Sequence, residues 1–207
     1  MPKPVTWEWA RPRLMPLLAG PYLDPPGEPL VRLVLPPGIA VAFGIDLGRG
    51  VIPYVDAAIA QRWECTPQQI GEAAVTNLER RAARIDPVVV SSGSLSGHIV
   101  RLLQRPAGWA SSVLLTTEHL KRLFGEHDQL FLAAGHGTLI SMAMDAPSHI
   151  AHELVFEYES RELYPLLLDP FALTDGELVW GGAREYDEYE YDDDDDDDAD
   201  PALLLAR

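Results

Sequence analysis

The sequence predicts an α+β fold, in which a mixed or antiparallel sheet is packed by several helices and is followed by a disordered acidic C-terminal tail. Three observations carry this prediction: short apolar runs bounded by turn residues, segments with helical periodicity, and a run of seven aspartates near the end. We expect a proline-rich N-terminal segment at residues 1–29, a single domain at 30–183 and the tail at 184–207. Consecutive aspartates repel one another and bring no apolar surface to bury, which favours disorder.

The first 29 residues are rich in proline, which predicts an extended or loop-like chain. Trp7 and Trp9 are expected to pack back on the domain, and the alternative is that they form an exposed anchor for a partner. The segment has no uninterrupted apolar stretch of the secretory kind, and no apolar run approaches the length of a membrane span. The single cysteine, Cys65, cannot form an internal disulfide. We therefore expect a cytoplasmic protein without a membrane partner.

The first part of the predicted domain alternates strands with helices. Residues 30–35 and 39–45 are apolar runs on either side of a Pro-Pro-Gly turn, and both are predicted strands. Residues 51–55 are a further predicted strand, and because Pro53 cannot donate to a ladder it lies on a sheet edge or at a strand end. A short helix is expected at residues 56–63. The run Thr66-Pro67-Gln68-Gln69 predicts the start of a helix that continues to about Arg84. Thr66 is the N-cap, Pro67 takes the first helical position, and the Gln69 side chain can accept from the Thr66 amide.

The stretch from Trp109 to Phe171 supplies the centre of the predicted fold. Thr116 or Thr117 caps a helix that Gly125 ends, and a hairpin is expected from residues 130–134 and 139–144. Its turn is Gly135-His136-Gly137, whose glycines supply positive φ. Its near-continuous apolarity predicts strands covered on both faces, the alternative for such short runs being a buried helix. A helix is expected at residues 150–158. Beyond Pro165, which stops that helix, Asp175-Gly176 predicts a second hairpin between 171–173 and 177–180.

The serine- and glycine-rich residues 91–97 are predicted to form a flexible loop before a strand at 98–103. The alternative is that their hydroxyls and amides, with His98, bind phosphate or supply a nucleophile and its base. However, the segment lacks the lysine of a phosphate-binding loop and the glycine spacing of a serine nucleophile elbow. We therefore favour a mobile connection.

Three stretches carry a family resemblance, and they read VIPYVDAAIAQRWECTPQQIGEAAVTNLERR, SSVLLTTEHLKRLFGEHDQLFLAAGHGTLISM and ELYPLLLDPFALTDGELVW. Together they resemble the bacterial family of unknown function represented by the YtpQ-like proteins. The resemblance covers roughly residues 30–180 and rests on packing and turn signatures. It implies an intracellular α+β domain with no established activity, and it transfers no catalytic residue. The proline-rich start and the aspartate run lie outside it.

The histidines are the candidate metal ligands. His149 and His152 stand three residues apart on one predicted helix with Glu153 beside them, and His136 on the hairpin turn or His119 is the available third ligand. The order differs from the HExxH and HxxEH motifs, which favours solvated or capping histidines. The sequence thus predicts no catalytic residue and no cofactor. The alternative is a metal-dependent or hydrolytic enzyme that uses the histidines at 136–153.

The charge is concentrated in the tail. Of the 32 acidic residues, 12 lie between residues 185 and 200 with no Lys or Arg among them, and the remaining 20 stand against 16 bases. Such a run attracts basic proteins, and the absence of a basic patch excludes nucleic acid. We therefore predict a non-catalytic protein-binding or scaffold domain whose tail contacts a basic partner, the alternative being a tail that only confers solubility. The residues predicted to bind the partner are Asp192, Asp193, Asp194, Asp195, Asp196, Asp197, Asp198, Tyr186, Tyr189 and Tyr191.

Overall fold

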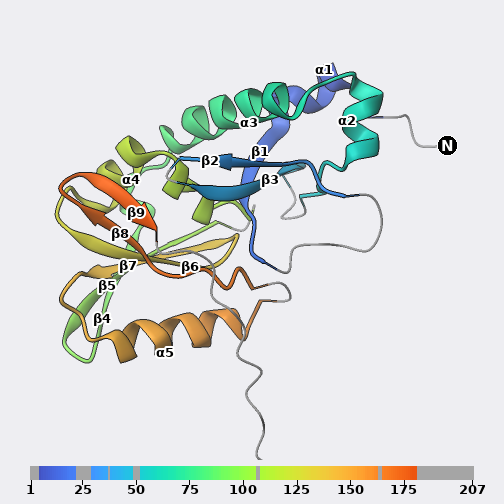
Figure 1. The fold of residues 1–207 in the computed structure, drawn as a ribbon. Helices are drawn as coiled ribbons and strands as arrows, with labels where there is room; N and C mark the ends of the chain where they lie inside the picture. Colours follow the sequence, from blue (N-terminus) through green and yellow to red (C-terminus); the bar gives the residue numbers. More distant parts are fainter. Residues whose placement is uncertain are drawn as a thin grey trace, which may run out of the picture.

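The computed structural model describes residues 5–21, 29–36, 38–48, 52–105, 108–162 and 165–180. The α+β prediction is confirmed, because the chain builds two antiparallel sheets, of three and six strands, with helices packed against them. Figure 1 shows the layers: helix α3 lies over the smaller sheet at the top, and helix α5 lies under the larger sheet at the bottom. The predicted tail, residues 184–207, lies outside the described residues.

The smaller sheet has the order β1-β3-β2, with every pair antiparallel. Its central strand β3 is almost wholly buried, as expected for an apolar run with a neighbour on each side. Pro16 lies in β1, an edge strand of this sheet, where a missing amide donor is tolerated. The strands are β1 (Leu14–Leu18), β2 (Arg32–Leu35) and β3 (Ile39–Ile45).

The larger sheet has the order β4-β5-β7-β6-β8-β9 and is also antiparallel throughout. The two predicted hairpins, β6–β7 and β8–β9, are both present in it. Positive φ angles at Asp175 and Gly176 form the tight turn of the second hairpin. The strands are β4 (Ser91–Leu95), β5 (His98–Gln104), β6 (Gln129–Gly135), β7 (Thr138–Ala143), β8 (Phe171–Thr174) and β9 (Glu177–Trp180).

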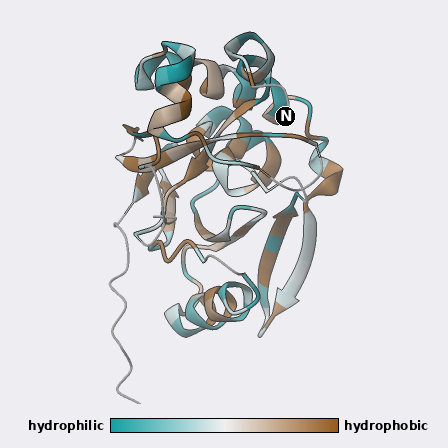
Figure 2. Cartoon of the chain, turned by 90° about the vertical axis from the view of Figure 1, so that its right-hand side faces the viewer, coloured by the Kyte–Doolittle hydropathy of each residue, from teal (hydrophilic) through white to brown (hydrophobic). Residues whose placement is uncertain are grey.

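The larger sheet is apolar on both faces, as the runs in β6 and β7 predict. Phe131 and Leu139 point into the main core, which also holds residues of α3 and the smaller sheet. Leu132 and Ile140, one position along each strand, point the other way, onto α5. In Figure 2 brown, the colour of hydrophobic residues, marks parts of several strands, while other parts are white or teal. The residues that α5 buries are Ile150, Ala151, Leu154 and Val155.

Helix α3 begins at its predicted cap, Thr66, whereas Thr116 precedes α4 without a capping bond, because its hydroxyl donates to the Val113 carbonyl oxygen. Asp56 accepts from the amide of Ile59 at the start of α2, and Thr66 and Gln69 form the reciprocal capping box of α3. No helix within the described ranges is both long enough and apolar enough to cross a membrane. The helices are α1 (Trp7–Ala10), α2 (Ala57–Trp63), α3 (Pro67–Ala82), α4 (Thr117–Phe124) and α5 (Ser148–Glu159), with the 3-10 turns η1 (Arg11–Arg13), η2 (Pro87–Val89) and η3 (Ser111–Leu115).

The N-terminal segment differs from its prediction. Helix α1 and turn η1 stand where proline density predicted an extended or loop-like chain, because Thr6 caps α1 and Pro12 occupies an early position of η1 that needs no amide donor. Strand β1 follows, and all its residues are buried. Trp7 packs on Trp63 as expected, with ring centroids 5.6 Å apart, whereas Trp9 is 41% exposed.

The predicted loop at residues 91–97 is wrong. Residues Ser91–Leu95 form β4 and pair with β5, and only Ser96 and Gly97 make the turn, both with positive φ. Serine and glycine have low strand propensity, so the local pattern indicates a loop. The ladder to β5 overrides that preference at this edge of the sheet.

Two other local predictions also need correction. Gly135 and Gly137 are not among the positive-φ glycines, so the β6–β7 turn uses them for another reason, the close approach of neighbouring residues. The strand predicted at residues 51–55 is reduced to an isolated bridge between Tyr54 and Gly44, and Val51 lies outside the described residues.

Candidate functional site

The three histidines predicted as metal ligands are not brought together. His149 and His152 lie with Glu153 on the exposed side of α5, because the helix turns its apolar residues to the sheet. His136 is held elsewhere, with a ring nitrogen 2.8 Å from the Leu18 carbonyl oxygen in the smaller sheet. Across the described ranges, no three His, Cys, Asp or Glu side chains form a group that could hold one ion. The predicted three-histidine site is therefore not formed.

The residues predicted to contact a partner lie beyond Trp180. Tyr186, Tyr189, Tyr191 and the aspartates 192–198 are all outside the described residues. The last described strand is β9, which lies at one edge of the six-stranded sheet. In the sequence, the acidic segment comes shortly after the end of this strand.

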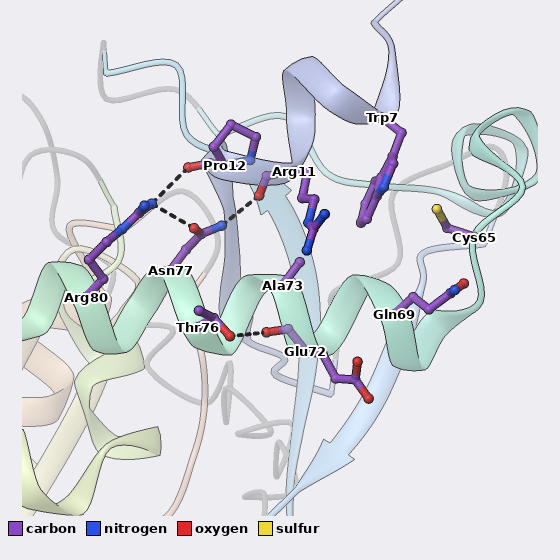
Figure 3. A pocket seen from close by; sticks show the side chains of 10 residues that line it. All are labelled: Trp7, Arg11, Pro12, Cys65, Gln69, Glu72, Ala73, Thr76, Asn77 and Arg80. Carbon is purple, nitrogen blue, oxygen red and sulfur yellow. Dashed lines mark hydrogen bonds between the residues drawn. The ribbon is translucent and has the colours of Figure 1, made fainter.

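A groove of about 590 Å³ runs between the N-terminal segment and α3. Figure 3 shows Trp7 and Arg11 on one side and the α3 residues on the other, with Cys65 at one end. In the same N-terminal segment, the Arg13 guanidinium lies 4.4 Å from the centroid of the Trp9 ring, a cation–π arrangement. Tryptophan and arginine are the residue types that contribute most to protein interfaces.

Asn77 forms the floor of this groove and fastens the N-terminal segment to α3. The side chain is 5% exposed, and its Nδ2 donates to the Arg11 and Leu14 carbonyl oxygens at 2.7 and 3.0 Å. Its Oδ1 accepts from Arg80 at 2.8 Å (Figure 3). Every polar atom of the amide is thus occupied by the fold, so Asn77 is a structural residue.

Cys65 is half-buried, and its thiol lies 3.4 Å from the Trp63 carbonyl oxygen. Burial, followed by the negative charge of Glu8, raises the pKa of this thiol above its ordinary value. A raised pKa keeps the sulfur protonated at neutral pH, and the thiolate is the nucleophile. The groove therefore lacks an activated cysteine.

A second recess, of about 560 Å³, lies where the two sheets meet. Its lining comes from the smaller sheet and the 52–54 segment, from the end of β5, from the β6–β7 turn and from the segment that follows α5. We call it the His136 recess. The lining residues are Leu17, Ile52, Tyr54, Gln104, Arg105, Gly108, His136, Gly137, Thr138 and Glu162.

His136 is fixed in this recess from two sides. Its carbonyl oxygen accepts from the Ser111 amide at 3.2 Å and from the Ser111 hydroxyl at 3.3 Å, while the ring Nε2 lies against the Leu18 carbonyl. A carbonyl only accepts, so Nε2 carries the proton and Nδ1 is an acceptor in the neutral ring. Burial lowers the pKa of His136 more than the Leu18 hydrogen bond raises it. The imidazole is therefore neutral at physiological pH.

Arg105 and Glu162, which carry opposite charges, both adjoin the β6–β7 turn and line the recess. The Arg105 amide donates to the Gly137 carbonyl oxygen at 2.9 Å, and a β-carbon at Gly137 would lie 3.2 Å from the Arg105 carbonyl oxygen. The Glu162 carboxylate fills the space that a β-carbon at Gly135 would need. A β-carbon at Gly135 would displace the Glu162 side chain, and one at Gly137 would make a tight contact with the Arg105 backbone.

Sequence reasoning singled out His136 but not Arg105, Glu162 or Asn77 as residues of a site. For Asn77 a signal existed, because it interrupts the apolar face formed by Ile70, Ala74 and Leu78, and a polar residue on a buried face needs a specific partner. Arg105 and Glu162 carry no such signal. Arg105 follows the end of β5 and Glu162 follows the end of α5. Only the fold shows that both line the same recess.

The comparisons with known proteins add no family to this description. No protein-family model, no curated protein and no solved structure matches the chain. The fold and the site therefore define the chain as an α+β protein with two antiparallel sheets, a surface groove along α3 and a polar recess at the junction of the sheets.

Proposed function

We propose that this protein is a non-catalytic protein-binding or scaffold domain whose acidic tail, residues 184–207, contacts a basic surface on a partner protein. The observation that carries the proposal is the segregation of charge. The tail holds 12 of the 32 acidic residues, whereas the rest of the chain is close to neutral for its size. A cluster of negative charges attracts a positively charged protein, which speeds their association and disfavours partners of the same sign.

The composition of the tail also supports binding. Tyr186, Tyr189 and Tyr191 alternate with acidic residues, and tyrosine contributes apolar contact area together with a hydrogen-bonding group at interfaces. A sequence that only conferred solubility would not need three aromatic rings. The tail follows the edge strand β9, so the folded domain acts as the platform to which it is joined.

We further propose that the protein acts in the cytoplasm and that nucleic acid is not its partner. One cysteine in 207 residues agrees with a reducing compartment, and a net charge of −16 opposes phosphate binding. The resemblance to the YtpQ-like family remains part of this proposal, and it implies an intracellular domain without an established activity.

The test is a pull-down from the lysate of the source cell at low and high salt. The baits are the full chain and a chain ending at Ala183, and recovered proteins are quantified by mass spectrometry. We expect a basic protein to be recovered by the full chain only, and to be lost at high salt because exposed charges are screened.

Two matched variants separate charge from length and from aromatic contact. In the first, Asp192 to Asp198 are all changed to Asn, which keeps the length and removes seven charges. In the second, the three tyrosines of the tail are changed to Ser. We expect the first variant to lose the partner and the second to retain it weakly. Equal recovery by the full chain and by the chain ending at Ala183 would refute the tail as the contact.

A further inference from the structure

We propose that the His136 recess binds a small zwitterion of the amino-acid type, with the ligand carboxylate at Arg105 and the ligand ammonium group at Glu162. This inference concerns the folded domain and goes beyond the tail-mediated contact. The recess volume of about 560 Å³ lies within the range of roughly 300–1,000 Å³ that is typical of small-molecule sites.

The charges of the recess are not satisfied by the part of the chain that the structure describes. Within it, Arg105 forms no ion pair, and its buried Nε has no hydrogen-bond partner. Glu162 lines the same recess, and its carboxylate likewise has no ion pair with a described residue. A cation and an anion, each without an ion-pair partner among the described residues, line the same cavity. A ligand that carries both charges suits it, because the ligand carboxylate pairs with Arg105 and the ligand ammonium group pairs with Glu162.

Contacts of the two side chains restrict where the charges lie. The Arg105 guanidinium lies 5.8 Å from the centroid of the Trp109 ring, and the Glu162 side chain packs against Gly135. Such confinement reduces the conformational entropy that a ligand must remove on binding. The recess therefore holds a cationic and an anionic side chain in restricted positions.

His136 and the apolar wall complete the site. The neutral imidazole presents Nδ1 as an acceptor without a hydrogen-bond partner among the described residues, and an ammonium group or an amide of the ligand supplies the donor. Leu17 and Ile52 also line the recess and offer apolar contact to the ligand side chain. Arg105 also lies over Trp109, at 5.8 Å from the ring centroid, which orients the guanidinium.

The experiment is isothermal titration calorimetry of the full-length protein with each of the twenty common L-amino acids at millimolar concentration. For an amino acid that binds, its deaminated acid and its decarboxylated amine are titrated as single-charge analogues. We expect binding of the zwitterion, and at least about tenfold weaker binding of both analogues, because each lacks one charge-assisted contact.

Four variants locate the site. Arg105→Gln and Glu162→Gln should each weaken binding by about 10- to 100-fold. The controls Arg62→Gln and Glu153→Gln remove exposed charges of the same types outside the recess and should leave affinity unchanged. Circular dichroism checks the fold. If Arg105→Gln does not fold, Arg105→Lys replaces it, since lysine keeps the charge but cannot form the planar two-point contact, and a clear loss of affinity is again expected.

Three outcomes would overturn the proposal. The first is that none of the amino acids binds. The second is that folded Arg105 and Glu162 variants bind as tightly as the unmodified protein. The third is that a single-charge analogue binds as well as the zwitterion, which would show that only one of the two charges is used.

Discussion

At the scale of single residues, the buried polar side chains of this protein are used mainly to hold backbone carbonyls. Asn77 bonds two carbonyls of the N-terminal segment, and the buried Ser112 hydroxyl donates to the Pro16 carbonyl oxygen at 2.7 Å. These contacts join residues that are far apart in the sequence. Because buried carbonyls without donors are costly, these side chains determine how the N-terminal segment attaches to the domain.

Replacing Asn77 by Ala should lower the free energy of unfolding by about 2–4 kcal/mol, since two buried carbonyls lose their donor. Urea denaturation measures the effect. The matched control is Thr76→Ala on the same helix. Thr76 bonds the Glu72 carbonyl within α3, at an exposed position, so its loss should change stability by less than about 0.5 kcal/mol. Similar values for both variants would contradict the structural role of Asn77.

His136 should make stability depend on pH. Its pKa in the folded protein is lowered from the ordinary value of 6.5, so below that pH the unfolded chain binds a proton that the folded chain does not. Stability therefore falls as pH falls through this window, by up to about 1.4 kcal/mol per pH unit for one proton.

His136→Gln keeps a donor for the Leu18 carbonyl and cannot titrate. We expect the loss of stability between about pH 7.5 and about pH 5.5 to be smaller in this variant than in the unmodified protein, as measured by urea unfolding at both pH values. Glu162 and the five other histidines are present in both proteins, so their contributions to the pH dependence of stability cancel in the comparison. Equal losses would show that His136 titrates normally.

At the scale of elements, the junction between the two sheets is closed by residues 165–168. The Leu166 amide donates to the Ala134 carbonyl oxygen of β6 at 3.2 Å, and the Leu166 carbonyl lies against Gly20, just after β1. A β-carbon at Gly20 would overlap that carbonyl. Glycine is required at this point by the approach of another backbone, and not by a positive φ.

Gly20→Ala should therefore destabilise the protein by about 1–3 kcal/mol, because a backbone segment and not a flexible side chain has to move. Gly93→Ala is the control. Gly93 lies in the edge strand β4 without positive φ, and an added β-carbon there would have no heavy atom within 4 Å, so alanine should be neutral or slightly stabilising. Thermal unfolding of the two variants compares them directly, and equal midpoints would contradict the tight junction.

At the scale of the whole molecule, one core unites the two sheets. The main cluster includes residues of β1 and β3 together with residues of β5 to β9 and of α3 and α4, so the smaller and larger sheets are expected to unfold together. The buried hydrophobic residues among the described ones run from Ala10 to Leu178. The net charge, in contrast, comes mainly from residues beyond this core.

A chain ending at Ala183 should thus keep the stability of the full chain at high salt, to within about 0.5 kcal/mol. It loses 12 acids and 2 bases, which changes the net charge from −16 to −6. Because like charges repel and salt screens them, added salt should raise the unfolding midpoint of the full chain more than that of the shortened chain. Thermal unfolding at two ionic strengths measures both. A marked drop in stability on shortening would instead show that the tail packs on the domain.

The sequence by itself determined the features that depend on neighbouring residues. The capping box at Thr66, the Asp175-Gly176 turn and the two-faced apolar strands β6 and β7 all follow from local patterns, because caps, turns and side-chain alternation involve residues a few positions apart. Charge segregation likewise needs only the order of residues.

Tertiary structure decided what depends on distant contacts. Strand β4 forms against its own local propensity because β5 supplies a ladder, and β1 joins the core because β3 pairs with it. In the same way, Arg105, His136 and Glu162 meet at one recess only because the β6–β7 turn lies between the end of β5 and the segment after α5. A site assembled from separate segments leaves no local pattern, since its members share a place in the fold and not in the sequence.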